Sequence, residues 1–171
     1  MTKRSIEYDQ FIKPIEDQMI RSVWRLIRDG DDADDVFQEA LLKIWKRWNR
    51  ICKHPNPHAL ILRICINAAY DHLRRNERMQ KHDPLDSVSA TLSDSSPLAW
   101  EEMEHEDKKS LIFRAIGALP KHQRLAVHMR YIEETSYPAI AQALGCGEAT
   151  VRKHVSRAIS KLRVVLSESS F

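Results

Sequence analysis

The chain has 171 residues, of which 43% are hydrophobic and 30% charged, so it can build one domain or two small ones. No apolar run approaches the roughly 20 residues that cross a bilayer, and no apolar signal region follows the first residues. We therefore expect a cytoplasmic protein with no direct insertion into a membrane. Three cysteines, an odd number, are not typical of a disulfide framework.

The net charge of +3 is distributed unevenly along the chain. Residues 1–82 carry 16 Lys and Arg against 12 Asp and Glu, residues 83–107 carry eight acids and no Lys or Arg, and residues 108–171 carry 11 bases against four acids. Two basic blocks favour a polyanion partner, because each neutralised phosphate releases counterions. The central segment is rich in Ser, Asp and Pro, as linkers are. We predict two domains, 1–82 and 108–171, joined by an acidic linker over 83–107.

Hydrophobic residues of the first block recur every three or four positions in three series, the pattern of amphipathic helices. The series run over 12–27, 36–48 and 60–73. Gly30, followed by two aspartates, is expected to end the first helix and begin the second. Pro55 and Pro57 separate the second helix from the third. The prediction is a three-helix, all-α N-terminal domain.

The second block predicts a helix-turn-helix near its end. Helical periodicity resumes over 108–118, Pro120 opens a further helix, and Ser136 is placed to cap a short one. A tight turn over 145–147 then leads into a basic amphipathic helix, which would lie in the major groove of DNA. The candidate DNA contacts lie in its N-terminal half, outside the apolar stripe: Arg152, Lys153, His154, Ser156 and Arg157. The alternative is an ordinary helical hairpin with a solvated basic face.

Two blocks of sequence carry a family resemblance. Residues 32–40 read Asp-Ala-Asp-Asp-Val-Phe-Gln-Glu-Ala, with a tryptophan a few residues on, and closely resemble region 2 of bacterial sigma-70-type factors of the extracytoplasmic-function group. Region 4 of that family is similar to a second set of positions: Leu119-Pro120-Lys-His-Gln-Arg124, Tyr131, Ser136-Tyr137, Ile140-Ala141, Leu144-Gly145, Thr150-Val151, Arg157-Ala158 and Leu162. The resemblance spans nearly all of the chain outside the linker. It implies an all-α, two-domain sigma factor that directs RNA polymerase to promoter DNA.

The resemblance also implies roles for particular residues. In the family, the acidic helix of region 2 binds the β′ clamp helices of core RNA polymerase, and the candidates here are Asp34, Asp35, Gln38, Glu39 and Leu42. The third helix is similar to the helix that reads the minus-10 element, with candidate contacts Arg63, Asn67, Asp71, Arg74 and Arg75. The loop over 49–58 takes the place where relatives hold a flipped promoter base. Region 4 implies minus-35 recognition and contact with the β flap.

Two further segments resemble the family. The acidic linker is similar to the connector that runs toward the polymerase active-site cleft. Residues 152–158 are similar to the iron-starvation subgroup, whose partners are membrane-bound anti-sigma regulators. The resemblance therefore implies an anti-sigma factor as a partner.

Three alternatives remain open at this point. Two cysteines and three histidines within 52–72 suggest a zinc site, although their spacing is not a usual finger pattern; they are Cys52, His54, His58, Cys65 and His72. A free-standing helix-turn-helix regulator would bind an operator without core polymerase. An enzyme would need a nucleophile and base pair, a phosphate loop or a metal motif, and the sequence has none of these patterns. We expect no enzyme activity and no cofactor.

Overall fold

The computed structural model describes residues 8–82 and 108–168, and its regular elements over these residues are all helical. The all-α prediction is confirmed, whereas the acidic linker over 83–107 lies outside the described residues. No helix in the described ranges combines the length and the apolar character needed to cross a bilayer. The elements are a helical segment over 8–11, η1 (Lys13–Ile15), α2 (Glu16–Trp24), α3 (Gly30–Lys46), α4 (Trp48–Ile51), α5 (Pro57–His82), a helix over 108–117, α7 (Lys121–Tyr131), α8 (Tyr137–Leu144) and α9 (Glu148–Glu168).

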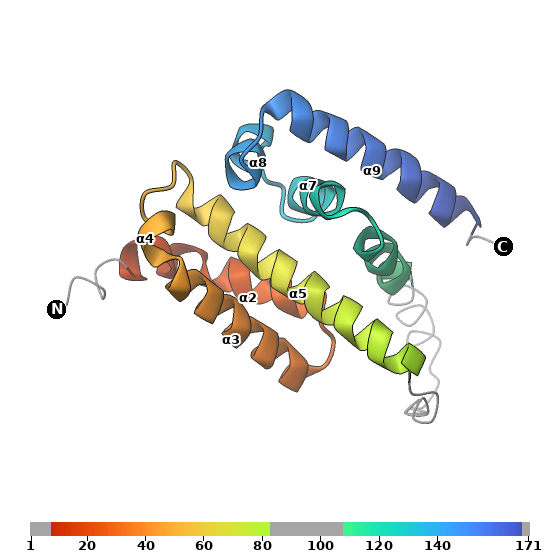
Figure 1. The fold of residues 1–171 in the computed structure, drawn as a ribbon, viewed down its shortest axis with the longest axis horizontal. Helices are drawn as coiled ribbons and strands as arrows, with labels where there is room; N and C mark the ends of the chain where they lie inside the picture. The colour runs from red at the N-terminus through yellow and green to blue at the C-terminus, as the bar shows by residue number, and fades with distance from the viewer. Residues whose placement is uncertain (1–7, 83–107, 169–171) are drawn as a thin grey trace, which may run out of the picture.

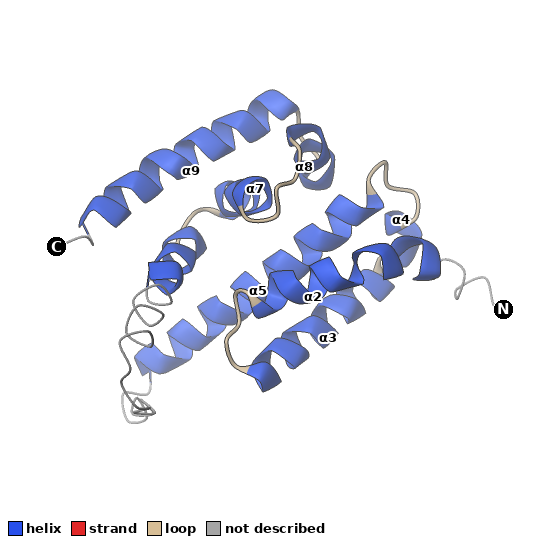
Figure 2. Cartoon of the chain, turned by 180° about the vertical axis from the view of Figure 1, so that it is seen from behind, coloured by secondary structure: helices blue, strands red, loops and turns tan. Residues whose placement is uncertain are grey.

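Helix α5 lies at the centre of the arrangement (Figure 1). Helices α2 and α3 pack on one side of it, and α7 and α8 pack on the other. Helix α9 is outermost and rests on α7 and α8, as the view from behind also makes clear (Figure 2). The buried hydrophobic residues of the two halves form one continuous core. The helix predicted to read the minus-10 element is therefore shared between both halves of the chain.

The first predicted helix of the N-terminal half, α2, is shorter than the hydrophobic series over 12–27 that predicted it. The predicted boundaries were wrong at both ends. Pro14 lies in the 3₁₀ turn η1, and α2 begins only after it, because proline has no N–H to donate. Helix α2 ends at Trp24, although Ile27 beyond it is still buried. Asp29 caps α3 by accepting a hydrogen bond from the backbone N–H of Asp32 at 3.0 Å. The carboxylate of Asp29 thus starts α3, and the predicted breakpoint Gly30 is its first residue.

The turn chemistry of the C-terminal half agrees with the sequence. Ser136 Oγ accepts a hydrogen bond from the backbone N–H of Ala139 at 3.4 Å and so caps α8. Gly145 ends α8 in the left-handed conformation with φ of 69°, which favours glycine. Val151 and Val155 on α9 are fully buried. Helices α8 and α9 form the predicted helix-turn-helix.

Candidate nucleic-acid interface

Helix α9 turns its apolar stripe inward and its basic face outward. Four of the five residues predicted to contact minus-35 DNA are exposed on this helix: Arg152, Lys153, Ser156 and Arg157. The Arg152 guanidinium stacks 4.1 Å above the ring centroid of Tyr137 in α8, and Arg130 of α7 lies 4.9 Å from the same ring. Such cation–π contacts hold an arginine over the aromatic face. The α9 face can therefore offer a fixed guanidinium fork to a base edge.

The fifth predicted minus-35 residue, His154, lies differently. It is half-buried, and its ring meets the ring of His122 in α7 edge-on, with centroids 5.6 Å apart. Burial lowers the pKa of His154, and the neighbouring His122 and Arg157 lower it further. The side chain of His154 thus packs against α7, apart from the four exposed residues.

Three of the five residues predicted to read the minus-10 element line one face of α5, and this face is partly covered. Arg63, Asn67 and Asp71 are all half-buried. The Arg63 guanidinium donates a hydrogen bond to the backbone carbonyl of Ala143 in α8. Asn67 Nδ2 donates to Asp71 Oδ2 at 2.8 Å, and Asp71 Oδ1 lies 3.9 Å from the Arg124 guanidinium of α7. The structure brings the three residues together, as their spacing predicted, and packs the C-terminal half over them.

Positive charge gathers around the start of α5. Burial lowers the pKa of the Arg63 guanidinium, and nearby Arg47 and Arg50 lower it further. A group of positively charged side chains this close together forms a surface suited to binding the phosphate backbone of a nucleic acid. The sequence singled out only Arg63 of these three, because Arg47 and Arg50 come from a different segment of the chain.

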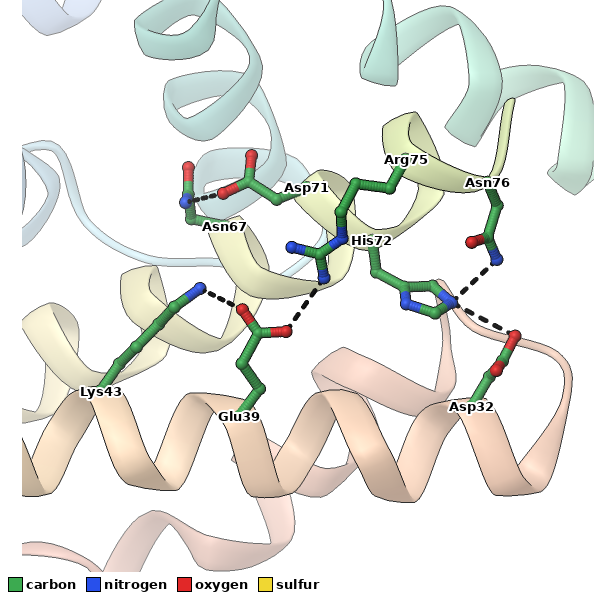
Figure 3. A network of polar contacts seen from close by, with 8 residues as sticks. All are labelled: Asp32, Glu39, Lys43, Asn67, Asp71, His72, Arg75 and Asn76. Carbon is green, nitrogen blue, oxygen red and sulfur yellow. Dashed lines mark hydrogen bonds and ion pairs between the residues drawn. The ribbon is translucent and has the colours of Figure 1, made fainter. Parts of the chain in front are cut away.

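The other two minus-10 candidates, Arg74 and Arg75, are exposed at the far end of the stripe. Arg75 donates a hydrogen bond to Glu39 Oε2 at 2.9 Å, and Lys43 lies 2.6 Å from the other oxygen of that carboxylate (Figure 3). The hydrogen bond from Lys43, with that from Arg75, outweighs burial and lowers the pKa of Glu39. Glu39, predicted to contact polymerase, is therefore already ion-paired within the chain.

The remaining polymerase candidates form an open face on α3. Asp34, Asp35 and Gln38 are exposed, and the Leu42 side chain is 59% exposed. Trp45 adjoins this face and is 41% exposed, with its ring 5.0 Å from that of Trp48. The hydrophobic series placed Trp45 with the buried residues, and this was wrong. The spacing of three residues between Leu42 and Trp45 could have predicted that Trp45 lies beside Leu42 on the exposed face, because residues three apart share a helix face.

A largely buried polar cluster, which no sequence pattern predicted, joins the two halves. The Tyr70 hydroxyl on α5 lies 2.8 Å from His128 Nδ1 on α7, and His128 Nε2 lies 3.5 Å from Glu133 Oε1. Two side chains of the α2 region also reach the segment after α7. Gln18 Nε2 donates to Glu133 Oε2 at 3.3 Å, and the Arg25 guanidinium donates to the carbonyl of Ile132 at 3.1 Å. Arg25 also lies 3.6 Å from Glu133. We call Gln18, Arg25, Tyr70, His128 and Glu133 the clasp.

The clasp predicts a dependence of stability on pH. Burial lowers the pKa of His128 below its ordinary 6.5, with Arg25 acting in the same direction and Glu133 opposing it. An unfolded chain therefore takes up a proton before the folded chain does, and stability falls as the pH drops through about 6.5. Burial would raise the pKa of Glu133, but His128, Gln18 and Arg25 hold it below 4.5, so its own contribution is lost only at lower pH.

Urea unfolding at about pH 7.5 and about pH 5.5 measures this effect, with His128→Gln as the reference. We expect the wild type to lose more stability across this interval than the variant, which has no imidazole at 128. Equal losses would assign the pH dependence to groups other than His128.

The loop between α4 and α5 is held to the C-terminal half. His54 Nε2 hydrogen-bonds the backbone carbonyl of Gln142 in α8 at 3.1 Å, and Asn56 caps α5 by accepting from the backbone N–H of Ala59 at 3.0 Å. A pocket for a flipped base in this loop stays a prediction.

The zinc alternative finds no support in the geometry. Within residues 8–82 and 108–168, no three His, Cys, Asp or Glu side chains are grouped so that they could hold a metal ion. Cys65 is fully buried, and burial raises the pKa of its thiol to about 12, which keeps the thiol protonated.

Comparisons with known proteins agree with this geometry. The family model for sigma-70 region 2 matches residues 11–79, and the model for sigma-70 region 4 matches residues 109–162. The chain is 28% identical over 158 residues to the RNA polymerase sigma-E factor of Streptomyces coelicolor, covering 92% of this chain and 85% of the relative. It is also 28% identical over 142 residues to the ECF RNA polymerase sigma-E factor of Escherichia coli K12, covering 80% and 74%.

Two solved structures share the fold. The sigma factor RpoE of Bartonella quintana, in complex with the anti-sigma factor NepR, aligns with a TM-score of 0.55 at 22% identity, covering 94% of this chain and 96% of that one. CnrH, in complex with the cytosolic domain of CnrY, aligns with a TM-score of 0.57 at 19% identity, covering 95% and 89%. The iron-starvation subgroup stays a prediction, because the relatives named here are sigma-E factors. With both regions matched in order, the chain belongs to the sigma-70 family and to its extracytoplasmic-function group of RNA polymerase sigma factors.

Proposed function

We propose that this chain binds core RNA polymerase and directs it to promoters, with a division of labour along the sequence. Residues 1–82 bind the core enzyme and read and melt the minus-10 element, residues 108–171 read the minus-35 element, and residues 83–107 link the two. The observation that carries the proposal is the presence, in one chain and in order, of both sigma-70 regions with an exposed basic reading helix in the second.

Recognition of minus-35 is assigned to α9. Arg152 and Arg157 are exposed in its N-terminal half, where an arginine fork can read guanine in the major groove. Lys153 and Ser156 beside them suit phosphate contacts, which fix the helix on the duplex without reading the sequence.

Recognition and opening of minus-10 are assigned to α5. Asn67 and Asp71 can hydrogen-bond the edges of unstacked bases, while Arg63, Arg74 and Arg75 hold the backbone. Binding of single-stranded bases offsets an opening cost of a few kcal/mol per base, so this step needs no covalent chemistry. We therefore propose a binding protein without catalytic activity of its own.

The exposed face of α3 is proposed as the main contact with the β′ clamp helices. Its carboxylates and amide suit a basic partner, and Leu42 with the adjoining Trp45 adds apolar area. The C-terminal half would contact the β flap. Because the similar sigma factor of Bartonella quintana is in complex with an anti-sigma factor, we propose that this chain is a cytoplasmic protein regulated by an anti-sigma factor.

Transcription in vitro tests the proposed function. The full chain is combined with core polymerase on a library of promoter fragments, and run-off transcripts are sequenced. We expect transcripts that start downstream of a shared pair of elements, and only when both protein components are present. Tight, sequence-specific binding of duplex DNA by the chain alone, without transcripts, would instead indicate an operator-binding regulator.

Replacing two residues of the α3 face is expected to weaken binding to core polymerase. In the double variant Asp35→Ala and Gln38→Ala, we expect affinity to fall roughly tenfold, since each lost polar contact at an interface costs about 0.5 to 1.5 kcal/mol. Fluorescence anisotropy of labelled chain titrated with core enzyme measures it. Asp17→Ala, which removes an exposed acid from α2, is the matched control and is expected to bind like the wild type. Full affinity in the double variant would count against this contact set.

A further inference from the structure

A cavity of about 680 Å³ opens beside the C-terminal half of α5, where the helix over 108–117 and the end of α2 approach it (Figure 1). Its volume falls within the range of about 300 to 1,000 Å³ that is usual for small-molecule sites. Three separate stretches of the chain supply its walls, over 24–28, 70–77 and 109–117. Among its lining residues only Arg74 has been given a role in reading DNA, and none has been given to polymerase. The proposed function therefore assigns no ligand to this cavity.

The inner part of the lining is apolar and aromatic. Tyr70 is fully buried, and Leu73 and Phe113 are half-buried. The Phe113 ring also contacts the ring of His128, with centroids 6.2 Å apart, and this contact helps to fix its position. Trp24, which is 47% exposed, adds an indole to the lining. Nucleic-acid bases stack on aromatic faces of this kind. The inner lining thus suits a flat aromatic group.

The outer part of the lining is basic. Among the described residues it contains a single acid, Glu77, against five exposed bases: Arg25, Arg28, Arg74, Lys109 and Arg114. Arg25 already contacts Glu133 in the clasp. The surplus of positive charge favours a ligand with several negative charges, because a concave surface lined by one sign of charge concentrates the opposite sign.

Two of these arginines are not compensated within the described parts of the chain. Arg74 and Arg114 form no ion pair and no side-chain hydrogen bond with any residue of 8–82 or 108–168. Burial lowers the pKa of the Arg124 guanidinium and nearby Arg74 lowers it further, with Asp71 opposing them, so positive charge accumulates here. Guanidinium groups bind phosphate oxygens through pairs of parallel hydrogen bonds. The outer lining therefore offers two such groups to a chain of phosphates.

A ligand that satisfies the whole lining needs both a flat ring and several negative charges. Inorganic phosphate would leave the aromatic side chains in contact with water, and a neutral aromatic molecule would leave the arginines without a partner. A nucleotide joins a base to phosphates through a sugar and so reaches both parts of the lining. A di- or triphosphate matches the basic surplus better than a monophosphate, because each further phosphate adds negative charge.

We propose that this cavity binds a nucleoside di- or triphosphate. The base lies against Trp24 and Phe113, and the phosphates meet Arg74 and Arg114. The ligand touches both halves of the chain, since residues 24–28 and 70–77 belong to the first and residues 109–117 to the second. This inference goes beyond the proposed function, because the site requires neither core polymerase nor promoter DNA.

Isothermal titration calorimetry of the full chain, freed of nucleic acid, measures the affinity. The ligands are the four ribonucleoside triphosphates, adenosine and inorganic triphosphate, each titrated separately. We expect the best of the four nucleotides to bind at least about tenfold more tightly than adenosine or inorganic triphosphate, because each of these reaches only one part of the lining. A nucleotide that binds no better than inorganic triphosphate overturns the proposal.

Arg114→Ala is expected to weaken nucleotide binding roughly tenfold, since a hydrogen-bonded contact with a charged group is lost. Arg21→Ala is the matched control, because Arg21 is also an exposed arginine but lies outside the lining. The double variant Arg152→Ala and Arg157→Ala is expected to bind nucleotide like the wild type, which excludes the basic face of α9 as the site. Equal losses in Arg114→Ala and Arg21→Ala, or a loss in the α9 variant alone, would overturn the site.

Tryptophan fluorescence locates the base. A base stacked on the Trp24 indole is expected to quench its emission, and Trp24→Phe removes this signal while keeping a ring on which the base can stack. We therefore expect Trp24→Phe to lose the quenching and to keep most of the calorimetric affinity. Quenching that persists in the variant overturns the proposed site. Single-stranded DNA that quenches Trp24, where the four nucleotides do not, overturns the proposal and assigns the cavity to promoter DNA.

Failure of this site and failure of the proposed function are distinguishable, because nucleotide binding is measured without polymerase. A chain that transcribes with core polymerase but binds no nucleotide overturns this inference alone. A chain that binds nucleotide but gives no transcript from any library promoter overturns the proposed function alone.

Discussion

Tyr70→Ala is expected to lower the free energy of unfolding by about 3 to 5 kcal/mol, the range for truncating a buried aromatic ring. Tyr70 is fully buried between α5 and α7, and its ring meets that of His128 edge-on, with centroids 5.4 Å apart. Removal leaves a cavity between the two halves and strips His128 Nδ1 of its partner. Urea denaturation of the full chain, followed by circular dichroism, measures the change.

Tyr70→Phe is the matched control, because it keeps the ring and removes only the hydroxyl. Its expected cost is about 1 to 3 kcal/mol, the penalty for leaving a buried imidazole nitrogen without a partner. A Tyr70→Ala chain within about 1 kcal/mol of the wild type would show that the halves do not pack on Tyr70 in solution.

The double variant Arg152→Ala and Arg157→Ala is expected to reduce transcription that depends on the minus-35 element by roughly a hundredfold or more. Each bidentate arginine contact with guanine discriminates by about 1 to 3 kcal/mol, and separated contacts add approximately. Run-off transcription from a cognate promoter, compared with the same promoter carrying a scrambled minus-35 element, measures the effect. The double variant is expected to transcribe the two templates equally.

Arg163→Ala controls for the loss of charge alone. Arg163 is exposed on the same helix but lies in its C-terminal half, away from the proposed base contacts. This variant is expected to keep its preference for the intact minus-35 element. If the double variant keeps that preference as well, α9 reads DNA through other residues.

Local features of the sequence predicted most of the helices and their caps. Ser136 and Gly145 act through bonds to neighbours a few residues away, so their effect is written into short stretches of sequence. Boundaries failed where a tertiary contact overrode the periodicity. Ile27 is buried by packing although it follows the end of α2. Its place in the hydrophobic series predicted its burial but could not show that the helix ends before it.

The candidate site was predictable as a set of residues and not as an arrangement. Spacing placed Arg63, Asn67 and Asp71 on one face of a helix, and the structure has them there. What covers that face depends on contacts between residues far apart in the sequence: Tyr70 with His128, 58 positions apart, and Arg63 with the carbonyl of Ala143, 80 positions apart. Every residue has a backbone carbonyl, so no sequence pattern predicts a contact that a side chain makes with a backbone carbonyl.

The Tyr137 ring contacts the guanidinium groups of both Arg152 and Arg130, and this links the evolution of α9 to that of α8. A side chain already held over a ring loses little rotational freedom when it meets a base, so part of the affinity of Arg152 is set in α8, outside the reading helix. Lysine at 152 would keep the charge but lose the planar fork and its stacking on the ring. Selection for a new promoter sequence would therefore act on Tyr137 together with Arg152, the residue that we propose contacts DNA.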